Sequence, residues 1–160
     1  MKTQERSAII PSPIGSLRIS AGPKGLRSIS VLTVPAKTAT AIPEECRAAV
    51  QALQKYFEGA ENPFSNLKLD AEGTDFEKLV WKALSKLKSG SVMTYGELAE
   101  QVGHPGAARA VGTAMRKNPL PIIVPCHRVL ASGATREEPG EYACGTAKKK
   151  WLLKHEEKGN

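Results

Sequence analysis

The sequence predicts an α/β protein with two domains, a small N-terminal α/β domain over residues 1–72 and a mostly helical C-terminal domain over residues 73–160. The length of 160 residues suits one ordinary domain or two small ones packed together. Short β-like runs separated by turn residues occupy the start of the chain, and two helix-starting motifs occur in its second half. A polar run between them, Asp70-Ala71-Glu72-Gly73, is typical of a linker and places the boundary within a few residues.

The N-terminal part is expected to form an antiparallel sheet followed by one helix. Its apolar runs, Ala8-Ile9-Ile10, Leu17-Arg18-Ile19-Ser20 and residues 26–34, are separated by glycine and proline turns that suit hairpins. Residues 43–57 are predicted to be helical, because Pro43 suits a first turn and apolar residues recur at helical spacing before a glycine.

The second half opens with the clearest helical pattern of the chain. Thr74 and Glu77 form a capping box, in which the threonine hydroxyl takes the amide of residue 77 and the glutamate reaches back. An apolar stripe follows at helical spacing and is predicted to be core, with Ser89-Gly90 ending the helix. The stripe consists of Phe76, Leu79, Val80, Ala83, Leu84 and Leu87.

A second capping box, Thr94-Tyr95-Gly96-Glu97, begins a short helix, and a turn over residues 103–106 separates it from a helix over residues 107–117. This is the helix-turn-helix pattern, although helical hairpins in protein cores give the same pattern. The second helix could lie near a groove wall and contact phosphate, or pack tightly in the core. Its small residues are Ala107, Ala108, Ala110, Gly112, Thr113 and Ala114, and its basic residues are Arg109, Arg116 and Lys117.

The net charge of +7 is unevenly distributed along the chain. Residues 1–72 carry nine Lys/Arg and seven Asp/Glu, a net +2, and residues 73–160 carry fourteen and nine, a net +5. The excess of positive charge therefore lies in the half with the helix-turn-helix pattern. This is expected for a half that meets phosphates, although a solvated basic surface is an equal explanation.

The composition excludes several classes of protein. Hydrophobic residues make up 41% of the chain and charged residues 24%, and no apolar run approaches the roughly 18 residues of a membrane span. The first residues resemble no secretory signal, so an intracellular protein is expected. The cysteines Cys46, Cys126 and Cys144 include no close pair, which argues against a disulfide framework. The three histidines show no zinc-ligand spacing with them, so no metal site is predicted.

Pro125-Cys126-His127-Arg128 is the most informative motif of the chain. It follows an apolar run over residues 121–124 that predicts a short buried strand. A thiol beside a histidine at the end of a buried segment can be a positioned nucleophile, whereas a buried cysteine is more often inert packing. A free thiol has a pKa of roughly 8.5, so its reactivity requires a nearby base or positive charge.

The string Ile-Ile-Val-Pro-Cys-His-Arg-Val-Leu around Cys126 resembles the active-site signature of the O6-alkylguanine-DNA alkyltransferase family. The resemblance implies a small α/β N-terminal domain followed by a helical domain with a winged helix-turn-helix. Some relatives hold a zinc ion in the N-terminal half, but here that half has Cys46 and no histidine. Other segments that resemble the family occur in its order: Ser12-Pro13-Ile14-Gly15, Gly73-Thr74-Asp75-Phe76 with Val80-Trp81-Lys82-Ala83-Leu84, Thr94-Tyr95-Gly96-Glu97-Leu98-Ala99, Ala108-Arg109-Ala110-Val111-Gly112 and Asn118-Pro119.

The resemblance implies a repair protein that moves an alkyl group from O6 of guanine, or more slowly from O4 of thymine, onto its own cysteine once and without a cofactor. Cys126 would be the nucleophile and alkyl acceptor. His127 would draw off its proton through a water while Glu156 orients the imidazole. Asn118 would hold the turn that presents the cysteine. Tyr95 would crowd the neighbouring phosphate and donate its hydroxyl to the departing guanine.

The implied partner is double-stranded DNA carrying O6-alkylguanine, bound by a monomer in the minor groove with little sequence preference. The damaged base must leave the stack, and Arg109 would fill its place. Such a protein would work in the nucleus of a eukaryote or in the cytoplasm and nucleoid of a prokaryote. Met115, Val129, Tyr142 and Ala143 would line the base pocket with Arg109, and the DNA contacts would come from Thr94, Tyr95, Ala107, Arg109, Gly112, Arg116 and Lys117.

One loop departs from the family pattern, which usually ends Gly-x-Tyr-x-Gly-Gly. Here Gly140-Glu141-Tyr142-Ala143-Cys144-Gly145 keeps the tyrosine and has Cys144 where a glycine is usual. The preceding residues, 135–139, include two glutamates, and acidic residues beside a DNA-binding face oppose phosphate. Cys144 is either a second oxidisable thiol near the first or a simple small-residue replacement.

Two other classes of function stay open from the sequence. A non-catalytic binder of alkylated DNA would lack the nucleophile, and Cys126 is present. A cysteine hydrolase or thiol redox protein would carry a protease signature or a Cys-x-x-Cys pair, and the chain shows neither.

Overall fold

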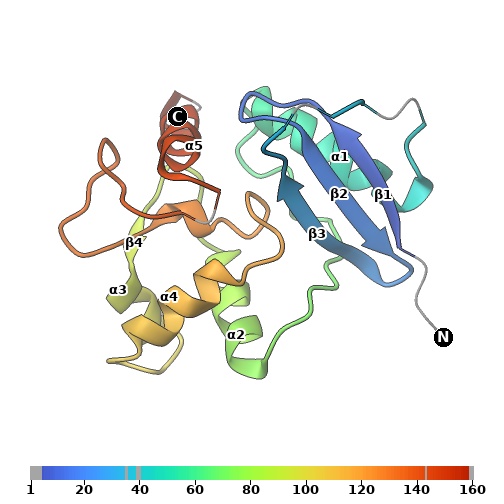
Figure 1. Ribbon diagram of the computed structural model, residues 1–160. Coiled ribbons are helices and arrows are strands. Elements are labelled where there is room, and N and C mark those ends of the chain that lie inside the picture. Colours follow the sequence, from blue (N-terminus) through green and yellow to red (C-terminus); the bar gives the residue numbers. More distant parts are fainter. Residues whose placement is uncertain (1–4, 35, 39–40, 143, 159–160) are drawn as a thin grey trace. The chain divides into compact units, whose positions relative to one another are not determined.

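The chain divides between residues 72 and 73 into two units, Met1–Glu72 and Gly73–Asn160. The computed structural model describes residues 5–34, 36–38, 41–142 and 144–158. Figure 1 shows the sheet of the first unit and the helices of the second. Among the helices of the described residues, none is long and apolar enough to cross a lipid bilayer.

The first unit is an antiparallel sheet with one helix on its face, as the sequence predicts. Strands β1 (Arg6–Ile10), β2 (Leu17–Gly22) and β3 (Gly25–Val31) pair in the order β1-β2-β3. Helix α1 (Glu44–Phe57) contacts all three strands and covers one side of the sheet (Figure 1). Alternate strand residues point to this helix because side chains alternate between the two faces of a strand. The buried residues of this core include Ala8, Ile10, Leu17, Ile19, Ala21, Leu26 and Ile29 from the sheet and Cys46, Val50 and Leu53 from α1.

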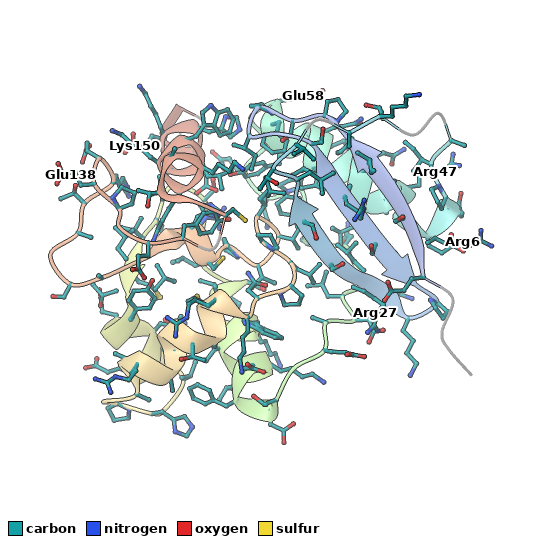
Figure 2. The ribbon with its side chains drawn as sticks, viewed as in Figure 1. Arg6, Arg27, Arg47, Glu58, Glu138 and Lys150 are labelled. Atoms are coloured by element: carbon teal, nitrogen blue, oxygen red, sulfur yellow. The ribbon has the colours of Figure 1, made fainter. Side chains whose placement is uncertain are left out.

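The end of the first unit is anchored along β3. The Leu26 amide donates to the Lys68 carbonyl over 2.9 Å, and the Asp70 amide donates to the Leu26 carbonyl over 2.8 Å. Arg27, which Figure 2 labels at the edge of the sheet, forms ion pairs with Glu5, Asp70 and Glu72 at 2.9, 2.8 and 2.7 Å. The polar segment predicted to be a linker is therefore held to the sheet as far as Glu72.

The second unit begins with helix α2 (Asp75–Leu84), which starts at the predicted capping box. The helix is shorter than predicted, because it ends at Leu84 and a turn follows, so Ser89-Gly90 does not terminate it. The predicted core stripe is wrong at Leu79, which is 42% exposed. The buried face of α2 includes Val80, Trp81 and Leu84. The Trp81 Nε1–H donates to the Ala114 carbonyl over 2.9 Å and so fixes α2 against the helix that contains Ala114.

A helix, a turn and a second helix follow in the predicted places. Helix α3 (Tyr95–Gln101) begins at the second capping box, and α4 (Ala108–Arg116) is one residue shorter at each end than predicted. The short strands β4 (Met93–Thr94) and β5 (Val129–Leu130) pair in parallel. A 3₁₀ turn, η1 (Cys126–Arg128), precedes β5, and the C-terminal helix α5 (Thr146–Lys158) contacts η1.

The apolar run over residues 121–124 is not the strand that the sequence predicts. It forms a tight buried turn, closed by the Val124 amide donating to the Leu120 carbonyl over 2.8 Å. Ile122 lies at the turn with a φ of 76°, a conformation that β-branched residues rarely adopt. Burial was predicted correctly, since Ile122 is 1% exposed and Val124 is 3% exposed. A buried apolar run is compatible with either structure, and here the tertiary contacts favour the turn.

Candidate active site

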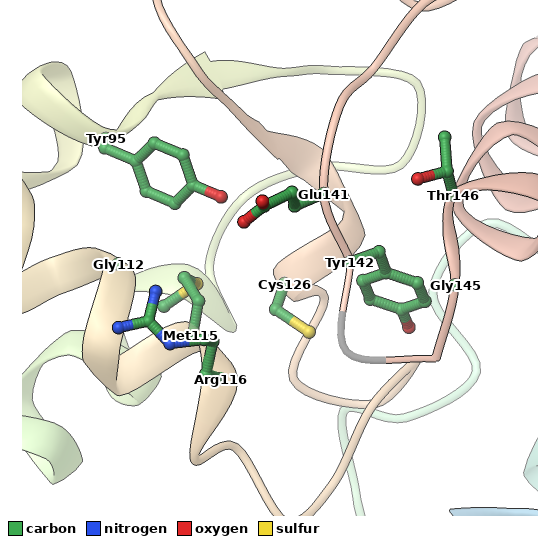
Figure 3. A pocket seen from close by; sticks show the side chains of 9 residues that line it. All are labelled: Tyr95, Gly112, Met115, Arg116, Cys126, Glu141, Tyr142, Gly145 and Thr146. Carbon is green, nitrogen blue, oxygen red and sulfur yellow. The ribbon is translucent and has the colours of Figure 1, made fainter.

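Cys126 lies at the wall of a cavity of about 240 Å³ in the second unit. The residue is only 5% exposed, because η1 follows directly on the buried turn. Figure 3 shows its side chain among those of Tyr95, Arg116 and Tyr142. Of the residues predicted to form the site, the structure brings six to this cavity: Tyr95, Gly112, Met115, Arg116, Cys126 and Tyr142, joined by Glu141, Gly145 and Thr146, to which the sequence assigned no role.

The turn before Cys126 is held by Asn118. The Asn118 Nδ2–H donates to the Val124 carbonyl over 2.8 Å, and the Leu120 amide donates to Asn118 Oδ1 over 2.9 Å. One side chain therefore bonds the backbone at both ends of the strained turn. A third bond, from the Cys126 amide to the Val124 carbonyl over 2.8 Å, joins the cysteine to the same segment.

A buried histidine–carboxylate pair lies behind the cysteine. His127 is fully buried, and its Nε2 is 2.6 Å from Glu156 Oε2 on α5. Burial lowers the pKa of His127 below its usual 6.5 despite the neighbouring carboxylate, so the imidazole is neutral at pH 7. Its Nε2–H then donates to Glu156, and Nδ1 keeps a lone pair that no described residue hydrogen-bonds. From the sequence, Glu156 was expected at the site only because of the family resemblance. The structure shows that this residue is buried, with 3% of its surface exposed.

Arg128 completes this cluster, although its place in the motif did not predict a role for it. Its Nε and Nη2 donate to the two oxygens of Glu156 over 2.9 Å each, and its Nη1 donates to the Leu87 carbonyl over 2.6 Å. Burial raises the pKa of Glu156, but His127 and Arg128 outweigh burial and hold the pKa well below its usual 4.5. The carboxylate is therefore ionised at neutral pH and orients both His127 and Arg128.

Lys149 is a second functional candidate that sequence reasoning missed. It is 1% exposed, and its Nζ donates to the Val129 and Glu141 carbonyls over 2.9 Å each. Burial lowers its pKa to about 8, while Cys126 and Glu141 oppose that shift. Lys149 thus ties the strand after the cysteine to the loop that lines the cavity. Its place among the lysines at 148–150 gave no signal, because a run of lysines normally indicates a solvated surface.

The thiol and the phenol of the cavity are both protonated at neutral pH. Burial raises the pKa of Cys126 to about 11, although Asn118, Lys149 and Tyr142 lower it. Burial also raises the pKa of Tyr95; the charges of Cys126 and Glu141 add to this shift, and Arg116 opposes it. The site thus holds a nucleophile that needs a base and a hydroxyl that can donate a proton.

The remaining predicted residues that the structure describes do not line the cavity. Thr94 caps α3 and takes the Glu97 amide over 3.1 Å, and Ala107 occupies the N-cap position of α4. Arg109 and Lys117 are exposed, on α4 and just after it. Val129 is fully buried in the core rather than at the cavity, and Ala143 lies outside the described residues. Among the residues that the structure describes, no group of three or more potential ligands could hold a metal ion.

Comparisons with known proteins give a consistent result. A family model described as the DNA-binding domain of 6-O-methylguanine DNA methyltransferase matches residues 75–158. A methylated-DNA–protein-cysteine methyltransferase of Methanosarcina barkeri is 42% identical over 156 residues, covering 93% of this chain and 95% of the relative. One from Mycobacterium tuberculosis is 43% identical over 151 residues, covering 92% of this chain and 89% of the relative.

Solved structures resemble the whole chain as well. The crystal structure of Mycobacterium tuberculosis O6-methylguanine methyltransferase matches with a TM-score of 0.83 and 37% identity, covering 98% of this chain and 95% of that one. The structure of Mycobacterium tuberculosis OGT in complex with DNA matches with a TM-score of 0.80 and 41% identity, covering 97% and 93%. The likeness therefore extends over both units in sequence and in fold.

Proposed function

The chain belongs to the family of methylated-DNA–protein-cysteine methyltransferases, and from this premise we propose that it removes an alkyl group from O6 of guanine by transferring it to Cys126. The observation that carries the proposal is the position of Cys126 at a cavity, directly before the buried His127–Glu156 pair. O4-alkylthymine is a slower substrate of the same site. Each molecule acts once, because no residue of the site can reverse a thioether.

His127 acts as the base for the thiol in this proposal. The neutral imidazole donates Nε2–H to Glu156 and keeps the Nδ1 lone pair for a proton from Cys126, relayed by a water molecule. Glu156 stabilises the imidazolium that forms, and the two Arg128 bonds hold the carboxylate in place. The thiol pKa of about 11 makes such a base necessary at neutral pH.

The transfer itself is a displacement at the alkyl carbon. The bond from Cys126 Sγ to carbon forms as the bond from carbon to O6 breaks, and its electron pair passes to the guanine. The Tyr95 hydroxyl, which lines the same cavity and is protonated, donates to the guanine. Cys126 loses one proton and the guanine gains one; a proton that passes from the His127 imidazolium to the Tyr95 phenolate restores both residues, so no cofactor enters the balance.

The α3–α4 pair is proposed to bind duplex DNA as a winged helix-turn-helix, with α4 in the minor groove. A base inside the stack cannot reach a buried sulfur, so the alkylated guanine must rotate into the cavity. The exposed side chain of Arg109 fills the vacated place, while Arg116 and Lys117 contact phosphates. The protein acts as a monomer inside the cell, where its DNA substrate is.

An intact-mass spectrum after mixing the protein with a duplex containing one O6-methylguanine tests the proposal. The expected result is a single added methyl group on the peptide of Cys126, an unmodified guanine in the duplex, and no further turnover. Cys126→Ser should gain no mass. Cys144→Ser is the matched control, since it removes a neighbouring thiol and should still gain the methyl group at Cys126.

Two outcomes would contradict the proposal. Binding of the lesion without any mass gain would indicate a protein that recognises alkylated DNA without repairing it. Methylation found on Cys144 rather than on Cys126 would show that the acceptor has been assigned to the wrong thiol.

A further inference from the structure

The cavity beside Cys126 contains a carboxylate that the proposed transfer does not use. Glu141, an exposed residue, lines the cavity together with Tyr95 and Cys126, and Figure 3 shows its carboxyl group beside the Tyr95 hydroxyl and above the cysteine in that view. Glu141 also acts on the Tyr95 hydroxyl, whose pKa it raises. In the proposed complex, a group on O6 of the bound guanine therefore comes close to this side chain.

The position of Glu141 is set by its backbone. The Glu141 carbonyl accepts a hydrogen bond from the buried Lys149 Nζ, which also binds the Val129 carbonyl three residues after the nucleophile. On the other side, the Thr146 hydroxyl donates to the Gly140 carbonyl over 3.1 Å and closes the loop. These bonds fix the backbone of Glu141 relative to the strand that follows Cys126.

We infer that Glu141 is a specificity-determining residue that makes the cavity discriminate between O6 substituents by charge, disfavouring anionic ones such as carboxymethyl. This inference rests on the proposed function. The alkyl carbon must come within bonding approach of Cys126 Sγ, so a carboxylate on the substituent enters the same small cavity as the Glu141 carboxylate. Like charges beside a protein surface repel each other more strongly than in bulk water, and the water that reaches the exposed Glu141 screens part of this repulsion.

Arg116 also lines the cavity but does not cancel this effect. Its Nη2 donates to the Thr113 hydroxyl on its own helix over 3.1 Å, and its exposed guanidinium is the group proposed to contact phosphate. In the free protein the charge of Arg116 acts on Tyr95 in the cavity, and in the proposed complex a DNA phosphate would offset that charge. The carboxylate of Glu141 is then the charged group of the cavity lining that the O6 substituent meets.

Two duplexes test the inference, one with O6-carboxymethylguanine and one with O6-carbamoylmethylguanine, which has the same shape without the charge. Single-turnover rates on both are measured for the wild type and for Glu141→Gln. The measured quantity is the transfer rate on O6-carboxymethylguanine divided by the rate on O6-carbamoylmethylguanine. This ratio should be roughly tenfold higher in Glu141→Gln than in the wild type, within a range of about 3- to 100-fold that depends on the water left between the charges. Added salt should raise this relative rate in the wild type and leave it unchanged in Glu141→Gln.

Glu138→Gln is the matched control. Glu138, labelled in Figure 2, is an exposed glutamate of the same loop region that does not line the cavity. The relative rate of Glu138→Gln should equal that of the wild type. An equal rise in both variants would assign the effect to the general charge of the loop and overturn the inference.

The remaining outcomes separate this inference from the proposed function. Transfer of methyl with an unchanged relative rate in Glu141→Gln would overturn the inference alone. Refusal of both substituents by a protein that accepts methyl would make size the determinant and would also overturn it. Failure to accept methyl from O6-methylguanine would remove the proposed function, and the inference with it.

Discussion

At the scale of single residues, the site depends on one amide side chain and one strained isoleucine. Ile122, at a φ of 76°, lies inside the turn whose two ends Asn118 bonds. Such a backbone costs on the order of 1–3 kcal/mol and persists only where its surroundings fix it. Asn118 supplies two of the hydrogen bonds that fix it, and the turn delivers Cys126 to the cavity.

Replacement of this amide should therefore impair both transfer and folding. Asn118→Ala should lower the free energy of unfolding by about 1–3 kcal/mol, because buried backbone groups lose their partners. The single-turnover rate of methyl transfer should fall between about tenfold and a hundredfold, because the nucleophile is no longer fixed. Urea unfolding and quenched-flow transfer assays measure the two effects. Asn66→Ala, at an exposed asparagine of the first unit, should change neither; an unaltered rate in Asn118→Ala would show that the turn holds Cys126 without this side chain.

At the scale of elements, η1 and α5 are joined by the Glu156 carboxylate, which accepts from His127 and twice from Arg128. Glu156→Gln should destabilise the protein at pH 7 by about 3–5 kcal/mol, because it leaves Arg128 buried without its counter-charge. The folded pKa of Glu156 is depressed, so the stabilisation is present above the unfolded value of 4.5 and lost as the pH falls below it. The wild type should therefore lose stability between about pH 5 and pH 3 more steeply than Glu156→Gln.

Thermal unfolding followed by circular dichroism from pH 3 to pH 7 measures this difference. The neighbouring Glu157→Gln is the control, since Glu157 is 43% exposed and 3.7 Å from Arg136. An exposed pair of this kind contributes about 0–1 kcal/mol, so its loss should leave the pH profile nearly unchanged. Parallel profiles for Glu156→Gln and the wild type would contradict the assignment of the acid sensitivity to Glu156.

The same elements show how far the sequence alone could predict the molecule. The starts of α2 and α3 were predicted correctly because a capping box is local, with all its atoms within four residues. Cys126 and His127 were found through a contiguous motif. Arg128 and Lys149 were missed because their partners lie 28 and 20 residues away, and only the tertiary fold makes them buried. The turn at Ile122 was missed for a related reason, since no residue preference indicates a positive φ at isoleucine.

At the scale of the whole molecule, the uneven charge predicts how binding to DNA responds to salt. Residues 73–160 carry a net +5 against +2 for residues 1–72, so the proposed DNA-binding half holds most of the excess. If two or three phosphates are neutralised, the association constant for a short duplex should fall about 10- to 40-fold between 50 and 200 mM salt, because the release of counterions drives binding.

Arg116→Gln should reduce the slope of log K against log salt by about one unit. Arg47→Gln removes the same charge from α1 of the first unit, where Arg47 pairs with Glu44 at 3.0 Å, and should leave the slope unchanged. Fluorescence anisotropy titrations measure all three slopes, and equal slopes for Arg116→Gln and Arg47→Gln would mean that the net charge of the chain, and not the α4 surface, controls binding.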